Sequence, residues 1–324
     1  MDVLSDVLRA VRLTGAIYFD IDAGAPWVGE SPSTAEIAAA VMPGSEHVIS
    51  FHAVISGSCW ASLTDGTLPP VRVDAGDVVV FPGGARNVMS SWPGARAEPN
   101  MAMYYRPIDE NLPFTMIHGG GGEERTRFIC GYLGCDARPF NPLLSALPPI
   151  LCARKPDRGN GWVTDLFRVA IAEGASRRTG GETVLAKLSE LLFVEIVRDH
   201  IEALPEDASG WLSGLRDAHI GEALRLVHSR PKENWTLDRL AHDVGLSRTA
   251  FATRFTHFVG VPPMQYLARW RLQLAGRILE QPKVSIAQAG AEVGYESEAA
   301  FNRAFKRVVG VPPGSWRKRR ATID

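Results

Sequence analysis

The chain has 324 residues, 45% of them hydrophobic and 22% charged, which suits a globular protein long enough for two or three domains. Its formal net charge of −1 is unevenly spread, because residues 1–210 hold 17 Lys or Arg and 26 Asp or Glu, whereas residues 211–324 hold 18 and 10. A mildly acidic front half joined to a basic back half indicates that the back half meets a polyanion, with a solvated basic surface as the alternative.

Nothing in the sequence signals export, membrane insertion or a disulfide framework. The first 15 residues lack the continuous apolar stretch of a secretory signal, and the longest largely apolar run, 191–197, is too short to cross a bilayer. Four cysteines, at positions 59, 130, 135 and 152, lack the spacing of a disulfide scaffold. We therefore expect a cytoplasmic protein with reduced thiols and no membrane contact.

Residues 47–90 predict short antiparallel strands of a sandwich or barrel, because Val, Ile, Phe and Trp runs are broken by Ser-Gly, Asp-Gly and Pro-Gly-Gly turns. The stretch GDVVVFPGGARN (76–87) resembles the second motif of the cupin barrel. It matches that motif at Gly76, Asp77, Pro82 and Gly84, but carries Asn87 where the motif ends in histidine. The resemblance implies a cupin-like barrel over residues 1–155.

A cupin metal centre needs three or four convergent nitrogen or oxygen ligands. Only His52, with His47 five residues earlier, falls where the first cupin motif places its histidines. The sequence therefore favours a barrel whose usual enzymatic metal site is missing or altered, and the chain is predicted not to be an enzyme. A cupin-type metal-dependent enzyme remains the alternative.

Two helices are expected after the barrel, at 161–175 and 181–204. The second is apolar over more than half of its circumference, which is typical of a helix in a core or an interface. We interpret residues 156–204 as a helical dimerisation or packing segment of a homodimer. A linker rich in Pro, acidic residues, Ser and Gly is predicted at 205–213.

The back half contains one module used twice, since GLSRTAFATRFTHFVGVPP (245–263) nearly repeats in GYESEAAFNRAFKRVVGVPP (294–313). Each copy predicts two helices joined by a tight glycine-containing turn, over 236–259 and 285–309. Phe251, Phe255 and Phe258 are expected inside the first copy, and Phe301, Phe305 and Val308 inside the second.

Between the copies, residues 262–281 predict one unbroken amphipathic helix that opens with prolines. About 18 residues at 1.5 Å each span roughly 27 Å, comparable to the ~34 Å between successive major grooves on one face of DNA. The fold class expected for the whole chain is therefore multidomain α+β: a cupin-like β-barrel with a helical dimerisation segment, followed by an all-α tandem helix-turn-helix domain over 214–320.

This repeat, the linking helix and the Gly-Val-Pro-Pro that closes each copy resemble the DNA-binding domain of AraC/XylS-type transcriptional regulators. The resemblance implies double-stranded promoter DNA and RNA polymerase as partners, with an activator favoured over a repressor. Exposed helix positions would then read the bases, and the prediction covers Arg248, Thr249, Ala252, Thr253, Glu298, Ala299, Asn302 and Arg303. Phosphate contacts are predicted for Ser247, Arg254, Ser297, Lys306, Arg307, Arg317 and Lys318.

The signal stays open between three chemistries. In a subgroup of that family, the stretch at 130–148 has counterparts in which histidine is common where this chain has Asn141, so Asn87 and Asn141 both replace expected ligands of a zinc site. Zinc or another divalent metal would then be held by His52, Cys130 and Cys135 together with Cys59 or His47. Cys130 and Cys135 suggest a thiol sensor as a second reading. The third is a small organic effector in an apolar barrel pocket, with candidate residues Phe51, His52, Trp60, Phe81 and Asn87.

The function predicted from the sequence is thus sequence-specific DNA binding that controls transcription, governed by an effector or by cysteine oxidation sensed in the barrel. A constitutive DNA binder with a purely structural barrel is the remaining alternative. The effector, the operator and the regulated genes do not follow from the sequence.

Overall fold

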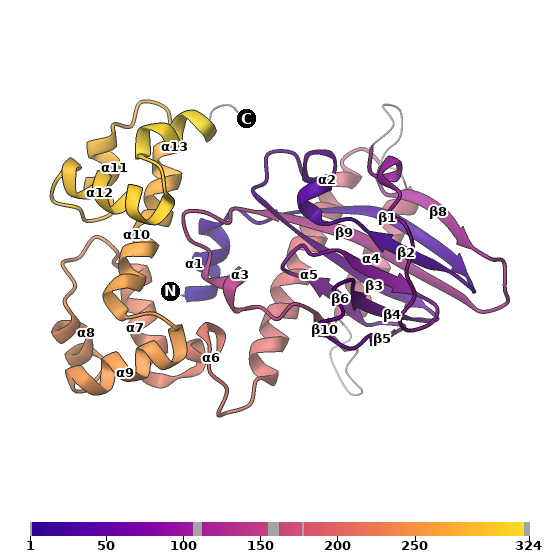
Figure 1. The fold of residues 1–324 in the computed structure, drawn as a ribbon, viewed down its shortest axis with the longest axis horizontal. Helices are drawn as coiled ribbons and strands as arrows, with labels where there is room; N and C mark the ends of the chain where they lie inside the picture. The colour runs from indigo at the N-terminus through magenta and orange to yellow at the C-terminus, as the bar shows by residue number, and fades with distance from the viewer. Residues whose placement is uncertain (1, 106–111, 155–161, 177, 321–324) are drawn as a thin grey trace. The chain divides into compact units, whose positions relative to one another are not determined.

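The computed structural model describes residues 2–105, 112–154, 162–176 and 178–320 (Figure 1). By its internal contacts the chain forms two units. The barrel unit comprises Leu13–Cys135 and Leu147–Glu202, and the helical unit comprises Met1–Arg12, Asp136–Ala146 and Ala203–Asp324. The sequence predicted domains at 1–155 and 214–320. It did not predict that two segments of the front half, Met1–Arg12 and Asp136–Ala146, group with the helical unit.

Two sheets build the barrel unit. The larger has the order β10-β6-β3-β9-β1-β8 and the smaller the order β2-β7-β4-β5. Their strands are β1 (Thr14–Gly24), β2 (Val28–Ser31), β3 (His47–Ser56), β4 (Ser58–Leu63), β5 (Val71–Asp74), β6 (Val78–Phe81), β7 (Asn87–Ser90), β8 (Phe114–Gly119), β9 (Arg125–Cys135) and β10 (Leu151–Ala153). Only β1 and β8 pair in parallel among these neighbours. The strands predicted within 47–90 are confirmed as β3 to β7.

β9 is the central strand of the larger sheet, paired with β3 on one side and β1 on the other. Its register places Cys130 opposite both His52 and Phe19. Gly131 is required here, because a Cβ at that position would come within 2.2 Å of the Phe51 ring. The apolar side chains between the two sheets form one core that includes Tyr18, Phe128 and Tyr132.

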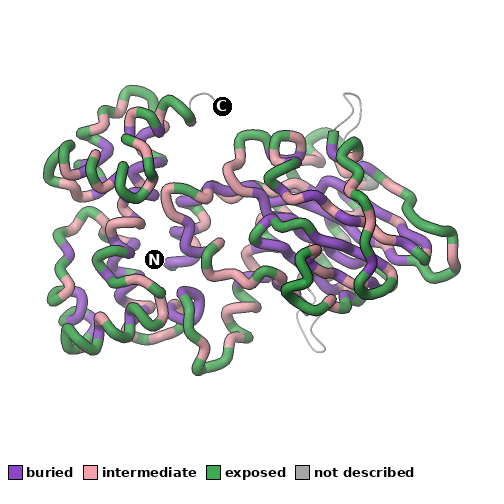
Figure 2. Tube along the Cα trace, in the orientation of Figure 1, coloured by how far each residue is buried: buried purple, intermediate pink, exposed green. Residues whose placement is uncertain are grey.

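Short helices accompany the strands: α2 (Thr34–Val41) and the 3-10 turn η1 (Met101–Tyr104). The two helices expected after the barrel are present as α4 (Trp162–Ser176) and α5 (Gly181–Ala203). α5 packs on the sheet at Gly15, whose N–H donates to Glu190 and whose missing Cβ leaves room for Ser189. Because α4 and α5 cover the outer face of the sheet, β3 and β9 are buried on both faces (Figure 2).

The helical unit holds both predicted helix-turn-helix motifs. Its helices are α1 (Val3–Ala10), α3 (Pro142–Ala146), α6 (Trp211–Arg216), α7 (Ala218–Ser229), α8 (Leu237–Asp243), α9 (Arg248–Val259), α10 (Pro263–Glu280), α11 (Ile286–Glu292), α12 (Glu298–Val309) and α13 (Pro313–Arg320). α8 and α9 form the first motif, α11 and α12 the second, and α10 joins them.

The repeat in the sequence is a repeat in the structure. The Ser247 and Ser297 hydroxyls cap α9 and α12 by accepting from Ala250 N and Ala300 N. The turns before these caps contain Gly245 and Gly294, with φ of +72° and +89°, which glycine adopts without strain. The rings of Phe251 and Phe255 lie 5.6 Å apart, and so do those of Phe301 and Phe305.

Three details differ from the sequence-based expectation. Val308 is 36% exposed rather than buried, and Phe258 is half-buried. The predicted linker 205–213 ends inside α6, because the Trp211 indole is buried and its Nε1 donates to the Tyr266 hydroxyl at 2.9 Å.

Candidate functional site

α9, the helix of the first motif that is predicted to contact bases, presents most of its predicted base-contact residues to solvent. Arg248, Thr249 and Thr253 are exposed, and Ala252 is half-buried. Arg248 forms an ion pair with Asp238 at 3.2 Å, which ties it to the first turn of α8. Arg254, predicted to bind phosphate, forms an ion pair with Asp217, the N-cap residue of α7.

In α12, the helix of the second motif that is predicted to contact bases, the exposed residues among the predicted contacts are Glu298, Ala299 and Arg303. Asn302 is half-buried, and its Nδ2 donates to the Glu298 carbonyl at 3.0 Å. Arg303, the next residue, is exposed and enters no ion pair or hydrogen bond among the described residues. α12 therefore carries an exposed cation beside a half-buried amide, the two kinds of side chain that pair with guanine and adenine in the major groove.

The predicted phosphate contacts are of two kinds. Lys306, Arg307 and Lys318 are exposed. Arg317 is half-buried, and its Nη2 donates to the Val284 carbonyl at 2.7 Å, so it supports the turn before α11. Ser247 and Ser297 are exposed capping residues at the N-termini of the two reading helices, where backbone N–H groups favour an anion.

The linking helix α10 has 18 residues and is anchored by aromatic side chains. The buried ring of Trp270 stacks on His228, with the ring centres 4.0 Å apart. His228 Nε2 lies 2.8 Å from the Tyr266 hydroxyl. Burial lowers the pKa of His228 to about 3, so this ring is neutral at pH 7.

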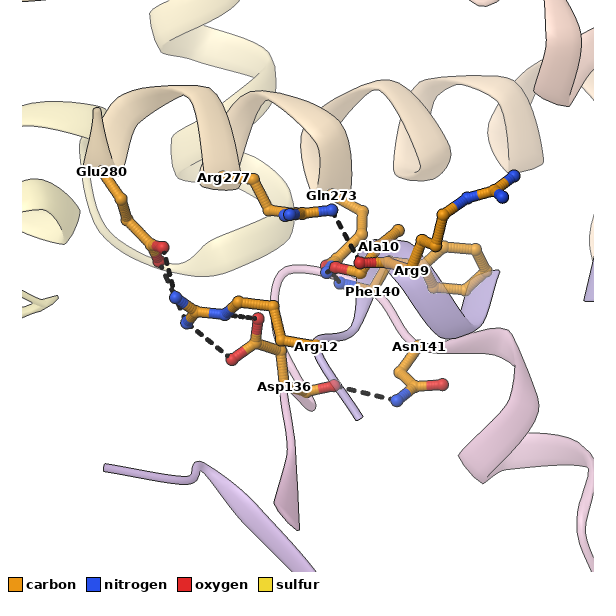
Figure 3. Close-up of polar contacts among 9 residues, drawn as sticks. All are labelled: Arg9, Ala10, Arg12, Asp136, Phe140, Asn141, Gln273, Arg277 and Glu280. Carbon is orange, nitrogen blue, oxygen red and sulfur yellow. Dashed lines mark hydrogen bonds and ion pairs between the residues drawn. The ribbon is translucent and has the colours of Figure 1, made fainter. Parts of the chain in front are cut away.

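Two segments bind α10 through a polar cluster (Figure 3). One is Met1–Arg12, which precedes β1, and the other is Asp136–Ala146, which follows β9. The Arg12 guanidinium donates to Asp136 at 2.9 and 3.0 Å and to Glu280 at 2.8 Å. The amide of Gln273, 1% exposed, donates to the Ala10 carbonyl at 3.1 Å and accepts from the Phe140 N–H at 2.8 Å.

This cluster was not predicted from the sequence. The residues that contact α10 or Arg12 in it lie more than a hundred residues from their partners, and several are backbone groups whose pairing leaves no sequence pattern. Asn141, which stands where a subgroup of the family commonly has histidine, contacts this cluster. Its Nδ2 donates to the Asp136 carbonyl at 2.8 Å, and its Oδ1 accepts from Leu144 N at 3.2 Å. It shapes the start of α3.

The barrel unit contains a cavity of about 140 Å³ between its two sheets. Residues of β1, β2, β3, β7, β8 and β9 contribute to it, together with the segment around η1. Among them are Phe19, Trp27, Glu30, His52, Met89, Met103, Tyr104, Met116, Phe128, Cys130 and Tyr132. Of the predicted effector-pocket residues, only His52 lines this cavity. Phe51 and Phe81 lie in the core, Trp60 is half-buried on β4, and Asn87 donates to Ser50 and Ala85.

His52 and Cys130 form a close pair across β3 and β9, with His52 Nδ1 2.8 Å from the Cys130 sulfur. Burial lowers the pKa of His52 to about 4, against a smaller opposing effect of Asn87, and burial raises the pKa of the Cys130 thiol. Both groups are therefore neutral at pH 7, and the thiol S–H is the natural donor to Nδ1.

The predicted cysteine pair is not brought together. Cys130 and Cys135 lie five residues apart on the single strand β9, about 17 Å at the usual rise per residue, whereas disulfide formation needs Cα atoms within about 7 Å. A disulfide between them would require β9 to break. Burial also raises the pKa of Cys59 to about 12, which disfavours the reactive thiolate.

Of the proposed metal ligands, His52 and Cys130 lie together, whereas His47 and Cys135 lie elsewhere. His47 Nε2 donates to the Pro82 carbonyl at 2.6 Å, and Cys135 lies opposite His47 at the far end of β9 from His52. Within the described residues, no three His, Cys, Asp or Glu side chains are arranged to hold a metal ion. None of the described helices is long and apolar enough to span a membrane.

Comparison with known proteins places these features in a family. Residues 2–202 match the family model described as Cupin, and residues 240–319 match the model described as Helix-turn-helix domain. The chain is 31% identical over 323 residues to a Streptomyces lividans chain described as an AraC-like transcription regulator, with 98% of each chain covered.

A Streptomyces antibioticus chain with the same description is 29% identical over 319 residues, covering 98% of this chain and 99% of that one. A solved AraC-type DNA-binding domain from Chromobacterium violaceum aligns with 32% of this chain and 92% of its own, at 29% identity and a TM-score of 0.30. The chain therefore belongs to the AraC-like transcription regulators, with an N-terminal cupin domain and a DNA-binding helix-turn-helix domain.

Proposed function

We propose that the chain is a one-component activator that binds promoter DNA as a homodimer, contacts RNA polymerase there and responds to a small organic effector held in the barrel unit. The exposed side chains of α9 and α12 support the DNA part. The length of α10, roughly 27 Å, allows the two reading helices to enter successive major grooves, which are about 34 Å apart.

The continuity of β9 carries the proposal that the barrel controls the helical unit. Cys130 and Tyr132 line the cavity on this strand, which ends at Cys135. The next residue, Asp136, binds Arg12, and Arg12 also binds Glu280 in the last turn of α10. An effector that displaces β9 would therefore alter contacts on the helix that joins both reading motifs.

An organic effector is better supported than cysteine oxidation, metal binding or catalysis. The thiols of Cys59 and Cys130 are buried, and their raised pKa values keep them protonated. His52, the buried histidine in the cavity wall, has a pKa of about 4 and bonds to a thiol, so it is not a base poised for catalysis near pH 7. The cavity is mostly apolar, as ligand pockets are.

The reading role of α12 is tested with duplex sites selected from a random pool by the full-length protein. Arg303→Ala should weaken the selected site by about fivefold to 150-fold and relax the preference at one base pair, because one arginine accounts for about 1–3 kcal/mol of discrimination. Lys306→Ala, the matched exposed cation on the same helix, should weaken all sequences alike and reduce the salt dependence. Fluorescence anisotropy on selected and scrambled duplexes measures both.

Equal loss on selected and scrambled DNA in Arg303→Ala would remove the base-reading role. Transcription from a selected site with purified RNA polymerase then separates an activator from a constitutive DNA binder. Transcription that no small molecule changes would contradict the effector part of the proposal.

A further inference from the structure

We infer that the two helix-turn-helix motifs recognise base pairs by different chemistry, and that α9 recognises the 5-methyl groups of thymines through the methyl groups of Thr249 and Thr253. The DNA site of one chain then has two unlike halves, one with methyl-sensitive thymines and one with a guanine contacted by Arg303. This inference deepens the proposed function and rests on it for the entry of α9 and α12 into successive major grooves.

The side chains of α9 offer little for hydrogen-bonded recognition of a base. The helix contains no Lys, Asn, Gln, Asp or Glu, and both of its arginines already pair with carboxylates. Arg248 lies 3.2 Å from Asp238. Arg254 pairs with Asp217, whose side chain is 7% exposed and caps α7. A bidentate contact with a purine from either arginine would require an existing ion pair to break.

The first two turns of α9 carry methyl groups instead. Thr249 and Thr253 are exposed and stand four residues apart, so their Cβ atoms lie about 5–6 Å apart on one face of the helix. In helix-turn-helix proteins the N-terminal residues of the second helix contact base edges in the major groove. Both threonines stand in that part of α9, whereas His257 lies in the last turn.

Apolar side chains surround both threonines. The two residues line a shallow hollow whose wall also includes Leu246, Ala250 and Phe258. Ala250 is exposed, and Leu246 and Phe258 are half-buried. A thymine methyl group placed there exchanges water for apolar contact, which is how Thr and Ala side chains recognise thymine.

The hydroxyl groups of the same threonines are the competing means of recognition. Neither hydroxyl enters a hydrogen bond among the described residues, whereas the Thr256 hydroxyl donates to the Ala252 carbonyl at 2.8 Å. A hydroxyl both donates and accepts, so it pairs with several bases and discriminates little among them. A methyl contact discriminates more, because only thymine presents a methyl group in the major groove.

α12 differs from α9 at the corresponding positions of the repeat. Counted from the serine that caps each helix, Arg303 of α12 occupies the position of Thr253 in α9. Asn302 likewise occupies the position of Ala252. Arg and Asn side chains form bidentate hydrogen bonds with guanine and adenine. One copy of the module therefore recognises bases by hydrogen bonds and the other by methyl contact.

Deoxyuridine tests this recognition, because it differs from thymidine only by the absence of the 5-methyl group. Each thymine of a duplex selected by the full-length protein is replaced in turn by deoxyuridine, and fluorescence anisotropy measures the affinity. At one thymine or more, the replacement should weaken binding about fourfold, the factor that corresponds to one buried carbon group. A site at which no replacement weakens binding would overturn the inference and leave the DNA-binding role standing.

Two double variants assign the effect to the threonine methyl groups. Thr249→Ser with Thr253→Ser keeps both hydroxyls and removes both methyls, so thymine and deoxyuridine duplexes should bind equally. Thr249→Val with Thr253→Val keeps the methyls and removes the hydroxyls, so the preference for thymine should remain. A preference that persists in the serine variant, or disappears in the valine variant, would overturn the role of the methyl groups.

Thr236→Ser is the control for loss of a methyl group. Thr236 is the exposed N-cap residue of α8, and serine caps a helix at least as well as threonine. The affinity of this variant and its preference for thymine over deoxyuridine should both equal those of the unaltered protein.

The positions of the effects separate this inference from the proposed function. The methyl-sensitive thymines should lie about one helical turn, roughly 10 base pairs, from the base pair whose preference relaxes in Arg303→Ala. Both effects within one half-site would overturn the assignment to α9. A protein that binds selected and scrambled duplexes equally would contradict the sequence-specific DNA binding of the proposed function itself.

Discussion

Arginine side chains of the helical unit differ in what their guanidinium groups already bind. Arg254 pairs with Asp217 and Arg317 donates to the Val284 carbonyl, so each supports the fold before DNA arrives. Arg303 is exposed and has no such described partner. A cation that must first give up an internal partner gains less from a phosphate or a base, and Arg303 is therefore the stronger candidate for recognition.

His228 makes the helical unit sensitive to acid. Its pKa is about 3 in the folded chain because the ring is buried, against about 6.5 when the chain is unfolded. Between these values the unfolded chain binds a proton that the folded chain does not, so stability present above pH 6.5 is lost as the pH falls toward 3. At pH 5.5 the loss from this one residue should be about 1.4 kcal/mol relative to pH 7.5.

Urea unfolding of the full-length protein at pH 7.5 and 5.5 measures this loss, and His228→Gln should remove most of it from the transition of the helical unit. His242→Gln is the control, because the His242 side chain is 89% exposed. An unchanged pH dependence in His228→Gln would show that other groups cause the acid sensitivity. His52, whose pKa is about 4, affects the barrel unit by the same mechanism.

The helix α10 is held by backbone groups of two other segments, and Gln273 is the side chain that binds both. Gln273→Leu would leave the Ala10 carbonyl and the Phe140 N–H buried without this partner. Each buried unpaired group costs about 1–3 kcal/mol, so for the two groups we expect a loss of about 2–6 kcal/mol in the free energy of unfolding. Chemical denaturation followed by tryptophan fluorescence measures it.

Arg277→Ala provides the comparison on the same helix. Arg277 is exposed and donates to the Arg9 carbonyl at 2.6 Å, so its removal should cost less than about 1 kcal/mol. If Gln273→Leu proves as mild as Arg277→Ala, the two segments do not depend on this amide for their position on α10.

Elements defined by local signals could be predicted from the sequence. Each helix-turn-helix motif has its two signals close together in the sequence. A glycine with positive φ, Gly245 or Gly294, comes shortly before the serine that caps the next helix, Ser247 or Ser297. The cavity could not be predicted in the same way, because its wall is assembled from strands distant in sequence. Of five proposed pocket residues only His52 lines it, and Trp27 went unnoticed because an isolated tryptophan carries no pattern.

At the scale of the whole chain, the two units are joined more often than a single linker would allow. The sequence predicted one connection at 205–213, but the chain passes between the barrel and helical units at four places, after Arg12, Cys135, Ala146 and Glu202. The segments Met1–Arg12 and Asp136–Ala146 belong to the helical unit and contact α10. Arg12 links Asp136 to Glu280, and Gln273 of α10 donates to the Ala10 carbonyl.

The predicted homodimer is expected to form through the exposed apolar residues of α5. One face of this helix packs in the barrel unit, whereas Val184 and Leu191 are 41% and 45% exposed, two turns apart on one stripe. Leu191→Glu should raise the dimer dissociation constant at least about tenfold, since a symmetric interface meets the new charge twice. Sedimentation equilibrium measures this constant. Thr183→Glu, also exposed on α5, should leave it unchanged. A dimer that tolerates Leu191→Glu would have to form through another surface.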